Sequence, residues 1–395
     1  MSSEGITKVQ ALIALIAIIS SVTVGYFAAL PSAPTTPTYR KNGCTGTGNV
    51  KFGSPPMKID DIGLIVPMGA MIGGHVTPID HQYYQPADFK SLPDTYDVMV
   101  IGDGVIVSIG LEGKPVESNG PGYNKYRLVI MHTCTFYSIY NLLTSLSPRI
   151  TAVTGEIKPA STAEVNIPVR EGEIIGKIGG QTLDLSVNDD NVILKGFIMP
   201  EHYQSEPWKI HTVDPFDYFK EPVRSQLLAK NIREVQPLGG KIDYDIDGRL
   251  VGNWFKENTN GYGAVERQRY WSTHLAIVYD HVDPTQIRVS LGDFNGSATQ
   301  FGVKGNSPDP ANVTVSTGLV KYDLVQFDYY LGDTGQGWDR FTYAKGLKSR
   351  NIGNTIFGVV LLQLIQDRKL KVEIFLGKTS SDVIGFSDAA MIYER

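Results

Sequence analysis

Cysteine is scarce in this chain. Only Cys44 and Cys134 occur among 395 residues. Two cysteines are too few for a disulfide framework or for a zinc cluster built from thiolates. Pairing of the two is one option, because disulfides persist outside the cytoplasm. The sequence therefore allows at most one structural disulfide, Cys44–Cys134.

Basic runs and nucleotide-binding motifs are also missing. The net charge is −5, and without a basic cluster we expect no nucleic-acid partner. The glycine-rich segments match no phosphate-binding motif, and no serine has nucleophile-elbow spacing. What the chain does have is Gly (41), Pro (22) and Tyr (20), a composition that favours β-structure with many turns.

The N-terminus carries the one long apolar run. No charged residue occurs in 9–39, and Val9–Leu30 is nearly all apolar. About 20 apolar residues cross a bilayer as a helix, so residues 1–30 are predicted to be an uncleaved transmembrane signal anchor, with cleavage as the alternative. Two glycosylation sequons, at Asn295 and Asn312, favour folded domains on the extracytoplasmic side of a single-pass protein.

The remainder divides into four segments. Residues 31–56 are rich in proline, threonine and glycine and are predicted to form a tether. Short β patterns fill 57–220, a helix with Pro222 in its first turn is predicted over 221–238 as a connector, and β patterns return over 239–395. The fold class is therefore mostly β, with two β domains after an N-terminal transmembrane helix.

Two hairpins are expected in the second domain, which suits a barrel or a sandwich. His274–Tyr279 and Ile287–Leu291 flank one turn. Thr355–Ile365 and Leu370–Leu376 flank another. Strands joined by such short turns are typical of antiparallel barrels.

The opening of that domain, Gly252-Asn253-Trp254, resembles the Gly-x-Trp motif of lipocalins. The resemblance implies a β-barrel whose tryptophan plugs one end, with a basic residue from a late strand stacked on it; Arg368 is a candidate. It also leaves open a role as a small-ligand carrier. Trp254 and Trp271 are candidate binding residues, or ordinary packing residues.

The densest set of chemically active side chains lies in the Gly/Pro-rich stretch 73–84. His75, Asp80 and His81 fall within seven residues. Imidazole and carboxylate groups are common metal ligands. The alternative is structural: the histidines hold the loop by hydrogen bonds to the backbone, and Asp80 caps a turn.

Motifs in the order of a known family surround this stretch. They are His75 with Asp80, Gly102–Val107, Leu128–His132, Tyr137–Leu142 and Val169–Gly179. In this order they resemble the lysostaphin-type zinc endopeptidases, β-rich enzymes that cut peptide cross-bridges in cell walls. The resemblance covers about residues 60–220 and implies a peptidase-like β-sandwich or barrel domain.

The chain departs from that family at the active-site positions. Where the family has His-x-His, this chain has Thr182-Leu183-Asp184, and Leu142 replaces another family histidine. A degenerate domain is therefore expected, in a membrane-anchored binding or scaffold protein whose partner is a cell-envelope protein or glycan. His75, Asp80 and Asp184, with His81 as an optional fourth ligand, remain a candidate site for Zn²⁺ or Mn²⁺. An active metal-dependent endopeptidase that acts on cell-surface peptide cross-bridges is the alternative.

Overall fold

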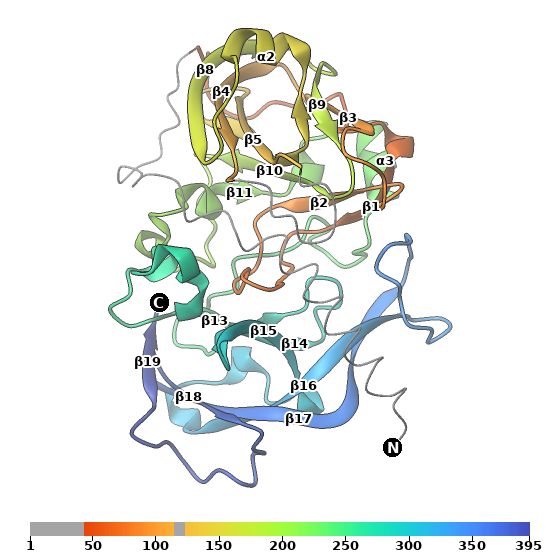
Figure 1. Cartoon of the computed structure of the whole chain (residues 1–395). Helices are drawn as coiled ribbons and strands as arrows, with labels where there is room; N and C mark the ends of the chain where they lie inside the picture. The colour runs from red at the N-terminus through yellow and green to blue at the C-terminus, as the bar shows by residue number, and fades with distance from the viewer. Residues whose placement is uncertain (1–42, 114–122) are drawn as a thin grey trace.

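The computed structural model describes residues 43–113 and 123–395, and it confirms the mostly β fold (Figure 1). Two β units follow one another along the chain: an N-terminal unit built on two sheets and a C-terminal closed barrel. The predicted signal anchor and residues 31–42 of the tether lie outside the described residues. Within the described ranges, no helix is both long and apolar enough to span a bilayer.

The N-terminal unit is organised around one large antiparallel sheet. Its strands, in spatial order, are β1 (Ile62–Val66), β2 (Gln82–Pro86), β10 (Leu183–Asp189), β6 (Phe136–Leu143), β5 (Tyr126–Met131), β4 (Gly104–Leu111) and β8 (Ser161–Val169), and β11 (Thr212–Val213) pairs with β10. A smaller sheet has the order β3 (Tyr96–Met99), β9 (Ile174–Ile178) and β7 (Ser145–Leu146).

Short helices lie between the strands of both units. The α-helices are α2 (Pro148–Thr154) and α3 (Val223–Leu228). The 3-10 helices are η1 (Ile59–Asp61), η2 (Pro200–Tyr203), η3 (Pro207–His211), η4 (Pro215–Asp217), η5 (Gly261–Gly263), η6 (Arg267–Thr273), η7 (Lys304–Asn306), η8 (Pro310–Asn312) and η9 (Val315–Thr317). The core of the N-terminal unit is apolar and draws on both sheets, with residues such as Ile106, Leu128 and Ile178 fully buried.

The connector helix is shorter than predicted. Instead of 221–238, α3 covers only Val223–Leu228. Beyond it, the Lys230 carbonyl accepts a hydrogen bond from Ile65 of β1, and Ile232 donates one back to Ile65. Because these backbone groups pair with the edge of the sheet, they cannot continue a helix.

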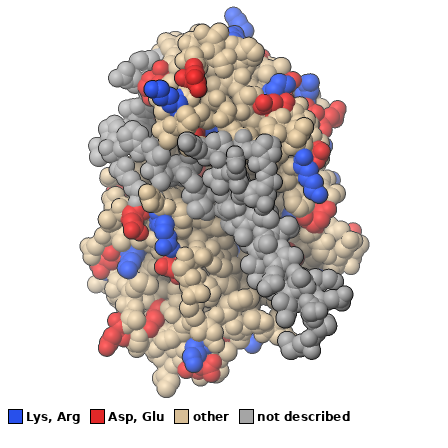
Figure 2. Space-filling view, in the orientation of Figure 1, with Lys and Arg blue, Asp and Glu red and all other residues tan. Residues whose placement is uncertain are grey.

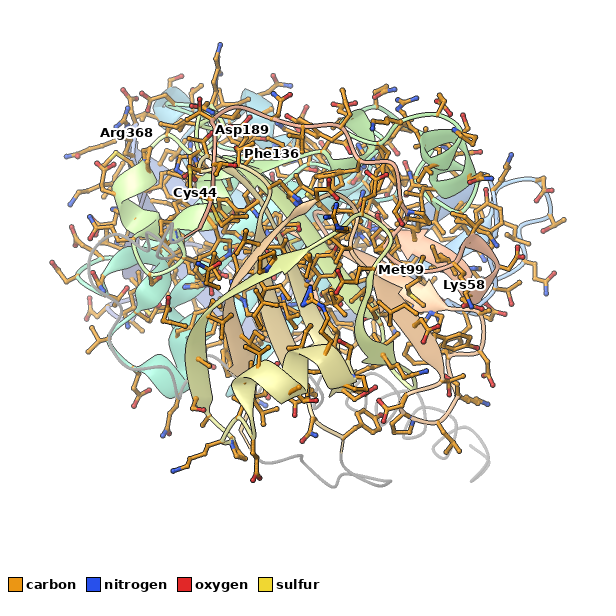
Figure 3. All side chains as sticks on the ribbon, turned by 90° about the horizontal axis from the view of Figure 1, so that it is seen from above. Cys44, Lys58, Met99, Phe136, Asp189 and Arg368 are labelled. Carbon is orange, nitrogen blue, oxygen red and sulfur yellow. A yellow bond between two sulfur atoms is a disulfide. The ribbon has the colours of Figure 1, made fainter. Side chains whose placement is uncertain are left out.

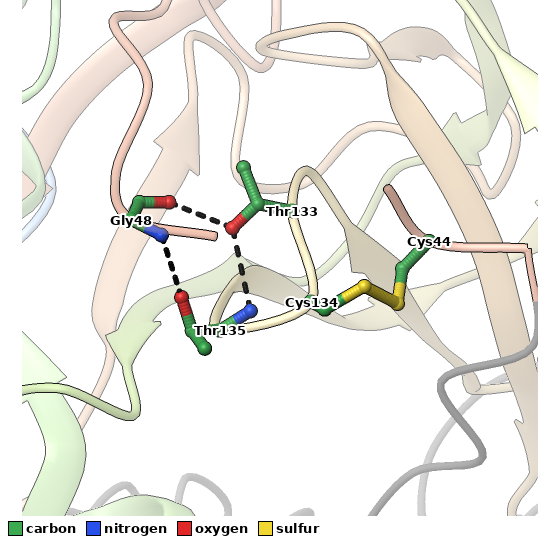
Figure 4. Close-up of a disulfide and its surroundings, with 5 residues drawn as sticks. All are labelled: Cys44, Gly48, Thr133, Cys134 and Thr135. Carbon is green, nitrogen blue, oxygen red and sulfur yellow. Dashed lines mark hydrogen bonds between the residues drawn. A yellow bond between two sulfur atoms is a disulfide. The ribbon is translucent and has the colours of Figure 1, made fainter. Parts of the chain in front are cut away.

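Part of the predicted tether also belongs to the fold. Phe52 is fully buried and forms a bridge with Phe219. Cys44 is joined to Cys134 by a disulfide, next to which Thr133 and Thr135 bond to the backbone of Gly48 (Figure 4). Seen from above, Cys44 lies near Phe136 and Asp189, which pair at the ends of β6 and β10 (Figure 3).

The C-terminal unit is a closed antiparallel barrel in which each strand pairs with the next. Its strands are β12 (Gly252–Lys256), β13 (His274–Tyr279), β14 (Ile287–Phe294), β15 (Ser297–Val303), β16 (Val320–Leu331), β17 (Leu347–Gln366), β18 (Lys369–Leu376) and β19 (Met391–Glu394). Pairing of β19 with β12 closes it. Both predicted hairpins, β13–β14 and β17–β18, are confirmed.

The barrel interior is filled by apolar side chains. Strand alternation directs residues such as Ile277, Val289 and Leu362 inward, where they are buried. Trp254 is fully buried and donates a hydrogen bond from Nε1 to the Leu250 carbonyl at 2.9 Å. Trp254 is therefore a core residue and not an exposed binding residue.

The basic residue on Trp254 is Arg395, and not the predicted candidate Arg368. The Arg395 guanidinium carbon lies 4.0 Å from the centre of a Trp254 ring. Arg368 instead pairs with Asp247 on the surface. Arg368 sits at the β17–β18 turn, whereas Arg395 directly follows β19, the neighbour of β12.

Strands β16 and β17 extend beyond the barrel as a two-stranded ribbon that reaches the N-terminal unit (Figure 1). Tyr329 and Leu347 of the ribbon pack with Leu64 of β1 and Ile232 of the connector. At the base of the ribbon, the buried Arg288 pairs with Asp280 at 2.9 Å. The packing of Tyr329 and Leu347 on Leu64 and Ile232 joins the two units, whereas the Arg288–Asp280 pair lies within the C-terminal unit.

The molecular surface is mixed in charge. On the face in Figure 2, the described acidic and basic side chains are interspersed. Both sequon residues, Asn295 in the β14–β15 turn and Asn312 in η8, are exposed.

Candidate functional site

The loop between β1 and β2 carries the predicted site and faces the barrel. Gln300 of β15 clasps it: the Gly73 amide donates to Gln300 Oε1 at 3.1 Å, and Gln300 Nε2 donates to the Gly73 carbonyl at 3.0 Å. Trp271 of η6 packs on Gly74, where an added Cβ would lie 3.2 Å from the indole ring. Trp271 therefore packs between the two units.

His81 lies between two of the predicted ligands. Its Nδ1 is 3.1 Å from Asp80 Oδ1, and its Nε2 is 3.4 Å from Asp184 Oδ2. The first contact is a hydrogen bond, whereas the second has only the distance of an ion pair, because no hydrogen-bond geometry is met at Nε2. Strand pairing causes this arrangement, since β10 places Asp184 opposite Tyr83 of β2, two residues after His81.

Both carboxylates have further partners. Trp208 Nε1 donates to Asp80 Oδ2 at 3.1 Å. Thr182 donates to Asp184 Oδ1 at 2.9 Å. Thr182 thus holds the Asp184 side chain in place.

His75 stands apart from the other predicted ligands. Its backbone is held in a tight turn with Ile72, and its ring centre is 6.1 Å from that of His81. Throughout residues 43–113 and 123–395, no three or more His, Cys, Asp or Glu side chains are arranged to hold a metal ion. The predicted metal set His75, Asp80 and Asp184 therefore does not converge, because the His81 ring lies between the two carboxylates.

Two residues that the sequence did not single out complete the site: Lys209 of η3 and Glu206, which precedes η3. Lys209 is 2% exposed, and its Nζ donates to the Pro78 carbonyl at 2.9 Å. Glu206 is 7% exposed and accepts a hydrogen bond from Tyr262 of η5. We call His75, Asp80, His81, Asp184, Glu206 and Lys209 the interdomain cluster.

Burial and mutual charge shift the pKa values of this cluster. Burial lowers the pKa of His75 to about 3, with help from His81 and Lys209. Burial acts to lower the pKa of His81 too, but Asp184 and Asp80 raise it above its usual value. Burial raises the pKa of Asp184 to about 6 and that of Glu206 to about 7. Burial would also raise the pKa of Asp80, yet Lys209 and His81 hold it well below its usual range.

The barrel covers the cluster with aromatic side chains. The Lys209 Nζ lies 5.2 Å from the centre of the Tyr262 ring. Tyr262 also packs with Tyr270 and with His274, whose Nε2 is 3.0 Å from the Tyr262 carbonyl. Only a cavity of about 40 Å³ remains beside the cluster, lined by residues that include His75, Asp80, Arg127, Glu206 and Lys209.

No family model, curated protein or solved structure matches this chain. Chemical inference therefore depends on the geometry of the cluster. Thr182 is engaged with Asp184, and His81 lies between Asp184 and Asp80. The site brings acidic and basic groups together around one small cavity, which His75 and Glu206 both line.

Proposed function

We propose that this protein is a membrane-anchored, extracytoplasmic binding or scaffold protein without peptidase activity. It combines a degenerate lysostaphin-type, metallopeptidase-like domain with a lipocalin-like barrel. The observation that carries the proposal is the interdomain cluster, whose carboxylates already have partners within the chain and whose outer side is covered by the barrel.

A peptidase of the resembled family needs a metal-bound water and a histidine that stabilises the tetrahedral oxyanion. Here His81 lies between Asp80 and Asp184. Since Leu142 and Thr182 stand at the positions of the supporting histidines, the residues present do not fit that chemistry. Tyr262 and Trp271 pack against the same side, which leaves a peptide little access.

The barrel supports the lipocalin-like part of the proposal. Trp254 on its first strand is covered by Arg395, which follows its last strand. Because the interior is packed with apolar side chains, the barrel is better suited to a rigid structural module than to a carrier. A ligand inside it would have to displace core residues, which costs several kcal/mol.

Peptide cleavage tests the proposal directly. The purified full-length chain is incubated with cell-wall cross-bridge peptides in the presence of Zn²⁺ or Mn²⁺, beside His75→Ala and Asp184→Ala variants. We expect no cleavage above the level of the two variants. Cleavage by the wild type that disappears in His75→Ala would show an active endopeptidase instead.

The binding role needs its own measurement. Co-sedimentation of the full-length chain with isolated cell-envelope material, before and after removal of its proteins, separates a glycan from a protein partner. Binding to neither preparation, under conditions where the chain is folded, would contradict the binding role.

A further inference from the structure

Three carboxylates of the interdomain cluster are nearly inaccessible to water. Asp80, Asp184 and Glu206 are 8%, 6% and 7% exposed. A buried carboxylate is costly unless cations or hydrogen-bond donors compensate it. His81 lies between Asp80 and Asp184 but contributes no bond to Glu206. Glu206 accepts a hydrogen bond from Tyr262, and a nearby positive charge would further favour its ionised form.

Lys209 provides a positive charge there. Lysine is almost never fully buried without compensation, yet Lys209 is 2% exposed. Its ammonium is held by the Pro78 carbonyl and by the face of the Tyr262 ring, and it lines the same cavity as His75, Asp80 and Glu206. Its charge acts to lower the pKa of both Asp80 and Glu206.

We propose that Lys209 is the resident cation of the interdomain cluster and stands in, beside His75 and Asp80, for the metal ion that the metallopeptidase resemblance implies. The residues present do not fit a metal, because a second cation would enter a cavity of about 40 Å³ next to an ammonium group. This inference rests on the same cluster as the proposed function, but it concerns charge compensation and not catalysis.

A double-mutant cycle on the full-length chain tests the charge role. Lys209→Met removes the positive charge that acts on Asp80 and Glu206, so we expect the folding equilibrium constant to fall by at least about 100-fold. Glu206→Gln in the Lys209→Met background should recover most of the lost folding equilibrium constant. The same substitution in the wild type should not increase that constant. Lys195→Met, at an exposed lysine of the same unit, is the matched control and should change little.

The cycle remains informative if Lys209→Met does not fold. In that case the Lys209→Met/Glu206→Gln double variant should recover folding, and its failure to do so would overturn the inference. Equal effects of Glu206→Gln in both backgrounds, or a fully stable Lys209→Met, would overturn it as well.

Zinc titration followed by thermal unfolding provides a second readout. The wild type should show no Tm increase with Zn²⁺. An increase that is lost in His75→Ala would mean that the cluster accepts a metal beside Lys209 and would refute the inference. Zinc binding without peptide cleavage would contradict the inference about Lys209 but not the proposed function. Cleavage without zinc binding at the cluster would contradict only the proposed function.

Discussion

At the residue scale, two arginines illustrate how the burial of a charged side chain determines its contribution to stability. Arg395 is 2% exposed and donates to the carbonyls of Val251, Ile246 and Arg249 while it covers Trp254. Arg368 forms an exposed pair with Asp247. A buried, multiply bonded guanidinium leaves several groups unpaired when it is removed, whereas an exposed ion pair contributes little.

The first prediction follows from this contrast. Arg395→Met keeps much of the apolar bulk but leaves three carbonyl groups without their donor, so we expect a loss of about 3–5 kcal/mol in the free energy of unfolding. Arg368→Met is the control and should cost less than about 1 kcal/mol. Denaturant unfolding of both variants checks this, and equal losses would contradict it.

The second prediction concerns acid. Burial lowers the pKa of His274 to about 3, whereas an unfolded histidine titrates near 6.5. Below about pH 6.5 the unfolded state binds a proton that the folded state refuses, so stability falls as the pH decreases toward 3. Burial lowers the pKa of His132 and His281 to about 4, and these two residues act in the same direction.

Denaturant unfolding at pH 7 and pH 5 measures this effect. His274 alone should account for about 2 kcal/mol of the decrease. Glutamine does not titrate, so between pH 7 and pH 5 the free energy of unfolding of His274→Gln should fall by about 2 kcal/mol less than that of the wild type. An identical decrease in the wild type and the variant would show that His274 takes up its proton without unfolding.

At the residue scale the sequence identified part of the site. Histidine is rare in the chain, and the motifs that resemble the peptidase family draw attention to the surrounding residues. Together these two signals single out His75, Asp80, His81 and Asp184. Lys209 and Glu206 were missed, since a Glu-Pro-Trp-Lys segment carries no ligand spacing and acquires its role only when the barrel buries it. The stacking of Arg395 was missed for a similar reason: only the closure of β19 onto β12 brings it to Trp254.

At the scale of elements, the loop between β1 and β2 depends on a strand that is distant in sequence. Gln300 of β15 makes both of its loop contacts to the backbone of Gly73. The loop has backbone hydrogen bonds of its own, such as those of Ile79 with Gly69 and Ala70, and Gln300 adds a link from its tip to the barrel. The third prediction tests this clasp.

Gln300→Ala removes both hydrogen bonds. We expect a loss of about 1–3 kcal/mol and faster amide hydrogen exchange over residues 69–81 than in the wild type. Gln336→Ala, at an exposed position of the ribbon, is the matched control. Unchanged exchange over the loop in Gln300→Ala would mean that other contacts, such as Trp271 packing and the Lys209–Pro78 hydrogen bond, hold the loop without Gln300.

The sequence predicted elements best where local signals were strong. The hairpins β13–β14 and β17–β18 were correct because turn residues separate two β-rich runs. The helix over 221–238 was too long, since the edge of β1 competes for the backbone of Lys230 and Ile232. The departure of the β16–β17 ribbon from the barrel depends on contacts with Leu64 and Ile232, which no local pattern encodes.

At the scale of the whole molecule, several sets of contacts hold the units together. They include the packing of Tyr262 on the interdomain cluster, the ribbon, the Gln300–Gly73 hydrogen bonds and an aromatic group that includes Phe197, Tyr203 and Phe255. The Cys44–Cys134 disulfide adds a covalent link within the N-terminal unit across a separation of 90 residues. A crosslink of that length restricts the unfolded chain strongly.

The fourth prediction concerns this bond. Replacement of both cysteines by serine should lower the free energy of unfolding by about 2–5 kcal/mol. The wild type under reducing conditions should approach the same value, and the variant should not respond to reductant. A variant as stable as the oxidised wild type would mean that the Thr133 and Thr135 contacts with Gly48 suffice.

The disulfide also determines where a mechanical load would enter the fold. Tension applied through the residues before Cys44 passes to Cys134, in the turn between β5 and β6, because the covalent bond bypasses the packing of Phe52. Strands β5 and β6 are interior strands, flanked by β4 and β10. A pull on the chain at Cys44 is therefore delivered to interior strands of the large sheet, where the load is shared with the neighbouring strands, and not to an edge strand.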